Sequence, residues 1–338
     1  MARIIDITPR SRDIQPVLML LTSHRLDCFL LCVKCLELYT DLSRFKKIYV
    51  VANAVSDEHA VIIKSFQQRH RGVIDVHVTP RGLIPAVVSM QNFILARHVD
   101  DVIVRLSEDV FVTPNWLDHL LAAYKLHRGD DSVPLASCVT PVSRTGRQVM
   151  DRALRAHFPD ERSRLPHLPM EANAVYHRFV WEKILHHGLV EKYLDLERPR
   201  HVYLGHISVD CVMFDRRLMD AVVPIPMRVP AGVGRVDEFH INGHLRTTGR
   251  RAVVATDAVV HHFSHSGPEA FLRRHVSLDD IWWYMTFLQD SPAYRVPRAF
   301  AARRPAGSGI VAPRLVGRAA PRPELLRLLR EREMRVLK

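Results

Sequence analysis

Apolar runs of strand length alternate with amphipathic stretches of helix length through the first third of the chain. The apolar runs that we interpret as buried strands are residues 17–21, 47–51, 74–78 and 102–112. The stretches that we interpret as helices are residues 26–39, 58–70 and 80–96. This alternation predicts βαβ units, which build a mostly parallel sheet flanked by helices. We therefore expect an α/β protein whose first half is Rossmann-like and suited to binding a nucleotide.

The pattern becomes less regular after residue 112. Strand-like runs occur at residues 133–139, 207–214, 252–255 and 258–262. Helical patterns occur at residues 116–127, 175–189, 216–222, 237–248 and 269–287. Between residues 142 and 200 strand signals are scarce. We expect one domain over residues 1–290, divided into a nucleotide-binding half at about 14–110 and a less regular half at 111–290.

The last part of the chain is basic and rich in proline. Residues 291–338 hold twelve Arg or Lys and three Glu, a net charge of +9, which leaves +3 of the total of +12 for the rest. A body this close to neutral speaks against a general nucleic-acid-binding surface, and we expect no nucleic-acid partner. The tail predicts contact with an anionic membrane face or an assembly partner; the alternative is a solvated arm. A terminal helix is expected at about 324–337.

Targeting and redox signals are few. Residues 1–16 are polar and charged, and the apolar run at 17–21 is too short for a signal-peptide core or a membrane span. The cysteine number is odd, which fits a reducing compartment. We expect a cytoplasmic protein, attached peripherally to the inner face of the membrane if the tail binds it.

Two adjacent carboxylates interrupt the fourth apolar run. Glu108 and Asp109 follow Ser107, and the apolar residues then resume as far as Pro114. Carboxylates at the end of such a strand lie where an open α/β sheet forms its ligand crevice, and oxygen ligands there suit a divalent cation. The alternative is an ordinary solvated strand end.

Other polar residues follow the expected strands. Thr22, Ser23, His24 and Arg25 lie after the first strand, and Asn53, Ser56 and Asp57 lie after the second. The pair Arg81-Gly82 opens the next helix, which also carries Asn92. Phosphate or base contacts and plain turn formation are both compatible with these residues.

Later in the chain, Asp237-Glu238 heads a helix just after the glycine-containing segment 231–234. One of the two could act as a general base, or both could complement the helix dipole. The last strand ends at His261 and His262, with His265 beyond.

The order of these landmarks resembles glycosyltransferase family 2, the inverting nucleotide-sugar transferases of the GT-A fold. The resemblance covers about residues 14–290. There are three departures. Ser107 stands where the metal motif usually begins with Asp, and Asp237-Glu238 reverses the usual order of the acidic pair. Ala52 stands where an acidic residue often reads the base.

The resemblance implies a metal-dependent transfer of a sugar from a nucleotide-sugar donor to a hydroxyl acceptor, in glycan or polysaccharide synthesis. It places Mn²⁺ or Mg²⁺ on Asp109, with Glu108 and His262 as further ligands. It makes Glu238 the general base, with Asp237 as the alternative. The residues that it assigns to the nucleotide sugar are Thr22, Ser23, Arg25, Asn53, Asp57, Arg81, Gly82, Asn92, Ser107 and Glu108.

Two competing classes remain. A nucleic-acid-binding or scaffold protein would act through the basic tail. A radical-SAM enzyme is indicated by the spacing of Cys28, Cys32 and Cys35. However, these cysteines lie inside an uninterrupted helical pattern at i, i+4 and i+7, which favours packing of all three on one buried face.

Overall fold

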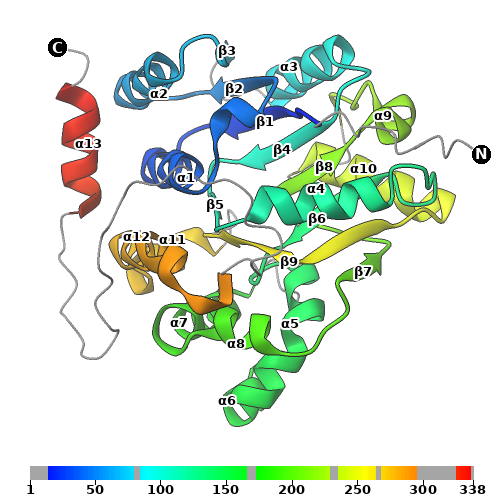
Figure 1. The fold of residues 1–338 in the computed structure, drawn as a ribbon. Helices are drawn as coiled ribbons and strands as arrows, with labels where there is room; N and C mark the ends of the chain where they lie inside the picture. The colour runs from blue at the N-terminus through cyan, green and yellow to red at the C-terminus, as the bar shows by residue number, and fades with distance from the viewer. Residues whose placement is uncertain are drawn as a thin grey trace, which may run out of the picture.

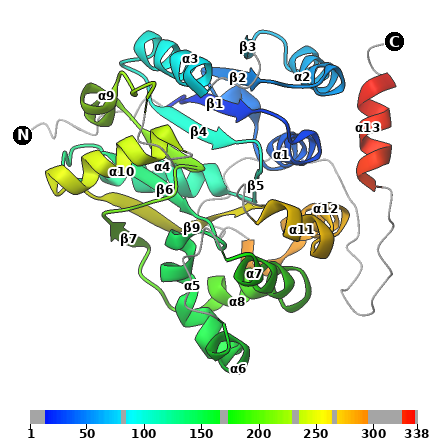
Figure 2. The same cartoon turned by 180° about the vertical axis from the view of Figure 1, so that it is seen from behind.

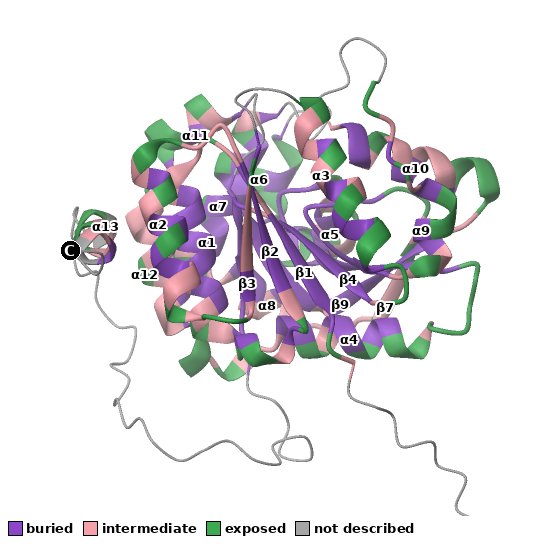
Figure 3. Ribbon diagram, turned by 90° about the horizontal axis from the view of Figure 1, so that it is seen from above, coloured by how far each residue is buried: buried purple, intermediate pink, exposed green. Residues whose placement is uncertain are grey.

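The computed structural model describes residues 14–79, 84–165, 173–228, 235–263, 268–294 and 325–335, and these build an α/β fold around one central sheet (Figure 1). The strands are β1 Val17–Thr22, β2 Lys47–Asn53, β3 Ile74–Thr79, β4 Ile103–Ser107, β5 Val110–Val112, β6 Leu135–Val139, β7 His201–Leu204, β8 Cys211–Phe214 and β9 Ala252–His262. Most strand residues are buried, with β3 and β7 as the exceptions, so the sheet is the core of the molecule (Figure 3). The α/β class predicted from the sequence is confirmed.

The sheet order is β3-β2-β1-β4-β8-β6-β9-β5, and β7 also pairs with β9. The strands β3, β2, β1 and β4 are parallel to one another, as the βαβ pattern predicts. Beyond β4 the sheet is mixed, because β8 is inserted antiparallel between β4 and β6. The antiparallel direction places the start of β8 at the edge where β1 and β4 end.

The helices of the first half are α1 Leu26–Tyr39, α2 Asp57–Arg69 and α3 Ile84–Arg97. Figure 3 shows α1 and α2 on one side of the sheet and α3 on the other. This division follows from right-handed crossovers, since the chain moves outward from β1 to β3 and then returns to β4. The Ser56 side chain begins α2 by accepting a hydrogen bond from the His59 amide, 3.2 Å away.

The acidic pair in the fourth apolar run splits it into two strands. We expected one strand over residues 102–112, but β4 pairs with β1 and β8, whereas β5 pairs with β9. In that second pairing Val110 lies opposite His262. Asp109 and the end of β9 are therefore brought together by backbone register, and the Phe263 amide donates to the Asp109 carbonyl at 2.9 Å.

The remaining helices of the body cover the later strands. They are α4 Trp116–Leu126, α5 Arg144–His157, α6 Pro159–Ser163, α7 Ala174–His187, α8 Leu189–Asp195, α9 Arg216–Val222, α10 Val236–Thr248, α11 Glu269–His275 and α12 Leu278–Phe287. The described residues of the region 142–200, where strand signals are scarce, are largely helical, and α7 confirms the helix expected at 175–189. Helices α5 to α8 form a group on one side of β9 (Figures 1 and 2). The stretch predicted as one helix over 269–287 is two helices.

Two strand predictions also need correction. Residues 252–262 form one long strand rather than two, with a register shift in its pairing to β6. The short strand β7 was not predicted at all. The helix α10 ends as predicted at Gly249, which takes the left-handed conformation with φ of 69°.

The C-terminal helix α13, Leu325–Arg335, contacts the body at α1, α2 and α12. Its Glu333 carboxylate is 4% exposed and bonds to Lys34, Arg69 and, at 2.7 Å, the Ser65 hydroxyl. Arg330 forms a two-pronged ion pair with Glu58. The terminal helix is thus anchored by charge to the first half rather than standing apart from it.

In the described part of the chain, no helix combines the length and the hydropathy needed to cross a membrane.

Candidate functional site

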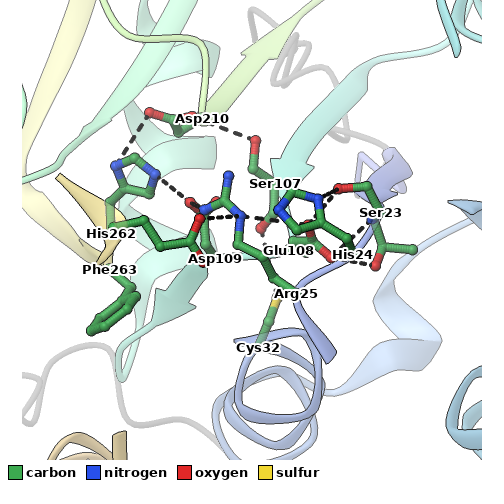
Figure 4. A network of polar contacts seen from close by, with 12 residues as sticks. Ser23, His24, Arg25, Cys32, Ser107, Glu108, Asp109, Asp210, His262 and Phe263 are labelled. Carbon is green, nitrogen blue, oxygen red and sulfur yellow. Dashed lines mark hydrogen bonds and ion pairs between the residues drawn. The ribbon is translucent and has the colours of Figure 1, made fainter. Parts of the chain in front are cut away.

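The site lies at the carboxyl ends of β1 and β4, where Glu108 and Asp109 form the turn into β5 (Figure 4). The Glu108 amide donates to the Leu21 carbonyl at 2.9 Å, which ties this turn to the end of β1. Both side chains are buried, at 4% and 1% exposure. The alternative of a solvated strand end is therefore wrong, because both carboxylates are buried and buried carboxylates require partners.

The partners of Glu108 are the two residues that end β1. Its Oε2 accepts from the Thr22 hydroxyl at 2.6 Å and from the Ser23 amide at 2.9 Å, and its Oε1 accepts from the Ser23 hydroxyl at 2.9 Å. The Thr22 oxygen also lies 3.0 Å from Nε2 of His59. With both oxygens bonded in this way, Glu108 fixes the loop after β1, which favours a positioning role over metal ligation.

The partners of Asp109 are cationic. Its Oδ2 lies 2.7 Å from Nε2 of His262 and also accepts from the Arg25 guanidinium. Burial alone would raise the pKa of Asp109, but His262 and Arg25 outweigh it and hold this pKa below the usual range. In turn, the pKa of His262 is raised: burial opposes its charge, and Asp109 and Asp210 favour it.

Of the histidines at the end of β9, His262 is the one that enters the site. His261 is buried on the opposite face of the strand, with its ring near the rings of Trp181 and Tyr284. Burial lowers the pKa of His261 to about 3, so it is neutral. His265 lies outside the described residues.

Asp210 is a site residue that the sequence did not reveal. It is fully buried, and its Oδ1 accepts from Arg235 at 2.5 Å and from the Ser107 hydroxyl at 3.4 Å. Its Oδ2 accepts from Ser208 and lies 3.7 Å from Nδ1 of His262. Its signal was an acidic residue directly before an apolar run. The carboxylates singled out from the sequence follow a strand or head a helix, whereas Asp210 precedes the antiparallel β8.

The two acidic residues that head α10 have different surroundings. Asp237 accepts from Arg105 in β4, at 2.9 Å to Nε and 2.7 Å to a terminal nitrogen, and both side chains are buried. Glu238 accepts from the Val209 amide at 3.2 Å and from Arg235 at 3.3 Å. Burial and then Asp210 raise the pKa of Glu238, while Arg235 opposes them. Arg105, a charged residue inside an apolar strand, was a signal that we overlooked.

The predicted nucleotide contacts beyond the acidic network are dispersed. Asn53 ends β2 and accepts from the Thr79 hydroxyl at 2.8 Å, while Asp57 is exposed at the start of α2. Asn92 bonds the backbone of Ile225 with both ends of its amide, at 2.7 and 2.9 Å, which favours a structural role. Arg81 and Gly82 lie outside the described residues.

The three cysteines of α1 are buried against the sheet as free thiols. Burial raises the pKa of Cys28, Cys32 and Cys35. Their position on one packed helical face favours the structural role over the radical-SAM alternative, because an iron–sulfur cluster needs accessible thiolates.

The donor set at the crevice suits a hard divalent cation in its chemistry. Asp109 supplies a carboxylate held in its ionised form, and His262 supplies an imidazole. Within the described residues, no group of three or more His, Cys, Asp or Glu side chains is arranged to hold a metal ion by itself.

The sequence matches no family model and no curated protein. Among solved structures, it is similar to a mannosyltransferase from Pyrobaculum calidifontis in complex with GDP-mannose and Mn²⁺, with 15% identity, a TM-score of 0.46, and coverage of 85% of this chain and 66% of that one. It is also similar to GalNAc-T7 with UDP, GalNAc and Mn²⁺, with 11% identity, a TM-score of 0.48, and coverage of 83% and 57%. This chain thus spans less than two thirds of either length.

Proposed function

We propose that this protein is a glycosyltransferase that moves a sugar from a nucleotide-sugar donor to a hydroxyl acceptor. The observation that carries the proposal is the convergence at one sheet edge of Asp109 and His262, 153 positions apart, with the acidic pair of α10 joined to them through Asp210 and Arg235. The sequence resemblance to glycosyltransferase family 2 rests on the same residues in the same order.

The donor would bind along the ends of β1, β2 and β4. Arg25 offers a guanidinium beside Asp109, where a diphosphate would meet positive charge. The loop that carries Thr22 and Ser23 is held rigid by Glu108, so its shape is formed before the donor arrives. Asn53, Asp57, Arg81, Gly82, Asn92 and Ser107 remain predicted contacts.

Asp109 and His262 are the residues that would hold Mn²⁺ or Mg²⁺, with Glu108 supporting them from the turn. When bound, the cation neutralises charge that develops on the diphosphate as the glycosidic bond breaks. Arg25 adds to the same neutralisation. We assign this part of the site to the leaving group, because it gathers the cationic side chains.

Glu238 is the general base in this proposal. Asp237 is paired with Arg105, and a carboxylate held in a buried ion pair is poorly suited to accept a proton. Glu238 has a raised pKa, which makes it the better proton acceptor near neutral pH. Attack of the deprotonated hydroxyl from the face opposite the leaving group would invert the anomeric centre.

The setting of the reaction is also proposed. We place the enzyme in the cytoplasm, in glycan or polysaccharide synthesis, with the basic residues after 290 in contact with an anionic membrane face or an assembly partner. The helix α13 within this tail contacts α1, α2 and α12, and residues 295–324 lie outside the described residues.

A thermal-shift screen of UDP-, GDP- and other nucleotide sugars, with and without Mn²⁺, tests the function. A ligand that binds the native state raises the melting temperature, so at least one donor should do so in wild-type protein and fail to do so in Asp109→Asn. The nucleotide monophosphates serve as matched controls. If no donor raises the melting temperature, whether Mn²⁺ is present or absent, glycosyl transfer is not the function.

A further inference from the structure

Six ionisable side chains form a continuous chain of contacts across the site. In spatial order the six are Arg25, Asp109, His262, Asp210, Arg235 and Glu238. Figure 4 shows the middle of this chain, where the His262 ring lies between Asp109 and Asp210. The first part belongs to the proposed leaving-group side. In the last part Glu238 is the proposed base, whereas Asp210 and Arg235 have no binding or chemical role in the function proposed above.

Arg235 occupies a bridging position in that last part. It is the residue just before α10, and one of its terminal nitrogens lies 2.5 Å from Oδ1 of Asp210 and 3.3 Å from Oε2 of Glu238. The same Glu238 oxygen accepts from the Val209 amide at 3.2 Å. Glu238 is therefore held by two donors, a guanidinium on its own helix and a backbone amide of the segment before β8.

Asp210 fixes the direction in which Arg235 points. It is fully buried and accepts hydrogen bonds from Ser107 at the end of β4 and Ser208 before β8, and His262 at the end of β9 lies 3.7 Å away on a third side. These contacts fix the position of the Asp210 carboxylate. The Arg235 guanidinium that pairs with it therefore lies beside Glu238.

We propose that Arg235 is a positioning residue that holds the base Glu238 in place, and that Asp210 is the anchor that places Arg235. This inference rests on the proposed function for the identity of Glu238 as the base. It gives Asp210 and Arg235 a role in the site beside Glu238. It also links the base to the leaving-group side through His262.

The proposal predicts opposite electrostatic effects for the two partners. The charged groups that face Glu238 are Asp210, Arg235 and Arg105, with Asp237 beside it in the chain. Arg235 favours the ionised form of Glu238 and Asp210 opposes it. Loss of the Arg235 charge should therefore raise the pKa of Glu238 further, and loss of the Asp210 charge should lower it.

The test compares Arg235→Gln, Asp210→Asn and Arg235→Lys with wild type. The Glu238 carboxyl is titrated by NMR on protein with ¹³C-labelled glutamate, with Glu238→Gln to assign the signal. The acid limb of the pH profile for donor turnover is measured in parallel. Arg216→Gln, which removes an exposed arginine paired with Asp220, is the matched control.

We expect Arg235→Gln to move the Glu238 titration upward and Asp210→Asn to move it downward, each by about one pH unit. The turnover number should fall in both while the KM for the donor changes less than twofold, and Arg235→Lys should recover part of the turnover. Arg216→Gln should leave the titration in place. A titration that moves the same way in both variants, or not at all, overturns the proposal. Titrations that move as expected in a protein that turns over no nucleotide sugar uphold the positioning and refute the proposed reaction.

Discussion

The two acidic pairs of the site are built on one plan. In each pair, one carboxylate is committed to holding the structure: Glu108 to the end of β1, and Asp237 to Arg105. The other carboxylate of each pair, Asp109 or Glu238, belongs to the chain of six ionisable side chains that runs from Arg25 to Glu238. In both dipeptides, one near the end of a strand and one at the start of a helix, one carboxylate thus has a structural role and the other is available for function.

The electrostatic outcomes for Asp109 and Glu238 are opposite. Burial disfavours the charged form of both. In Asp109 the neighbouring His262 and Arg25 outweigh burial, and its pKa is lowered. Glu238 has Asp210 nearby as well as Arg235, and its pKa rises. The difference teaches that Asp109 is kept permanently anionic, as suits a cation site, whereas Glu238 is poised to exchange a proton.

Asp109→Asn should have the largest effect, because it removes the anion shared by Arg25 and His262. Loss of one partner of a buried ion pair costs about 3–5 kcal/mol of stability. Loss of electrostatic stabilisation at the leaving group should lower donor turnover by about 10²-fold or more. Urea unfolding and a donor-hydrolysis assay measure the two effects. An Asp109→Asn protein with wild-type turnover would remove this residue from the leaving-group site.

Asp237→Asn should affect stability more than chemistry. It leaves the buried Arg105 without its carboxylate, so the free energy of unfolding should fall by about 3–5 kcal/mol. Turnover per folded molecule should fall less than in Glu238→Gln. The measurement is turnover normalised to the folded fraction determined by circular dichroism. If stability is unchanged, the Arg105 pair does not hold α10 in place.

Glu333→Gln is a control for burial without function, since Glu333 is only 4% exposed and is also surrounded by cations, but lies in α13. We expect a loss of about 1–3 kcal/mol with unchanged turnover. The pKa of Glu333 is lowered: burial opposes the shift, and bonds from Lys34 and Ser65 outweigh it. Its stabilisation is therefore present above the unfolded pKa of about 4.3 and is lost as the pH falls below it. Urea unfolding of both proteins at pH 7 and pH 3 should show the difference shrinking in acid.

The sequence predicted helices and strands well where the residues of the segment itself determine its bounds. The helix at 26–39 was predicted with the bounds of α1, because its apolar positions and its flanking turns lie within the segment itself. The split between β4 and β5 was missed, because the apolar residues on either side of Glu108-Asp109 look continuous. Their separation depends on pairing with β9, about 150 positions later in the chain.

The site residues were likewise predicted only where a local pattern marks them. Asp109, His262 and Glu238 follow strand ends or head a helix, which are positions that sequence reasoning searches. Asp210 and Arg235 were missed because their significance comes from the antiparallel insertion of β8, which no local signal announces. The roles within each acidic pair also depended on tertiary partners, such as Arg105 for Asp237.

The most direct test of the account is donor-to-acceptor turnover by Glu238→Gln at neutral pH, with its folded state checked by its unfolding midpoint. The account predicts a loss of about 10²- to 10⁴-fold in turnover number, the usual contribution of a general base, with a midpoint equal to or above that of wild type. Near wild-type turnover by the folded variant would contradict the assignment of Glu238 as the base.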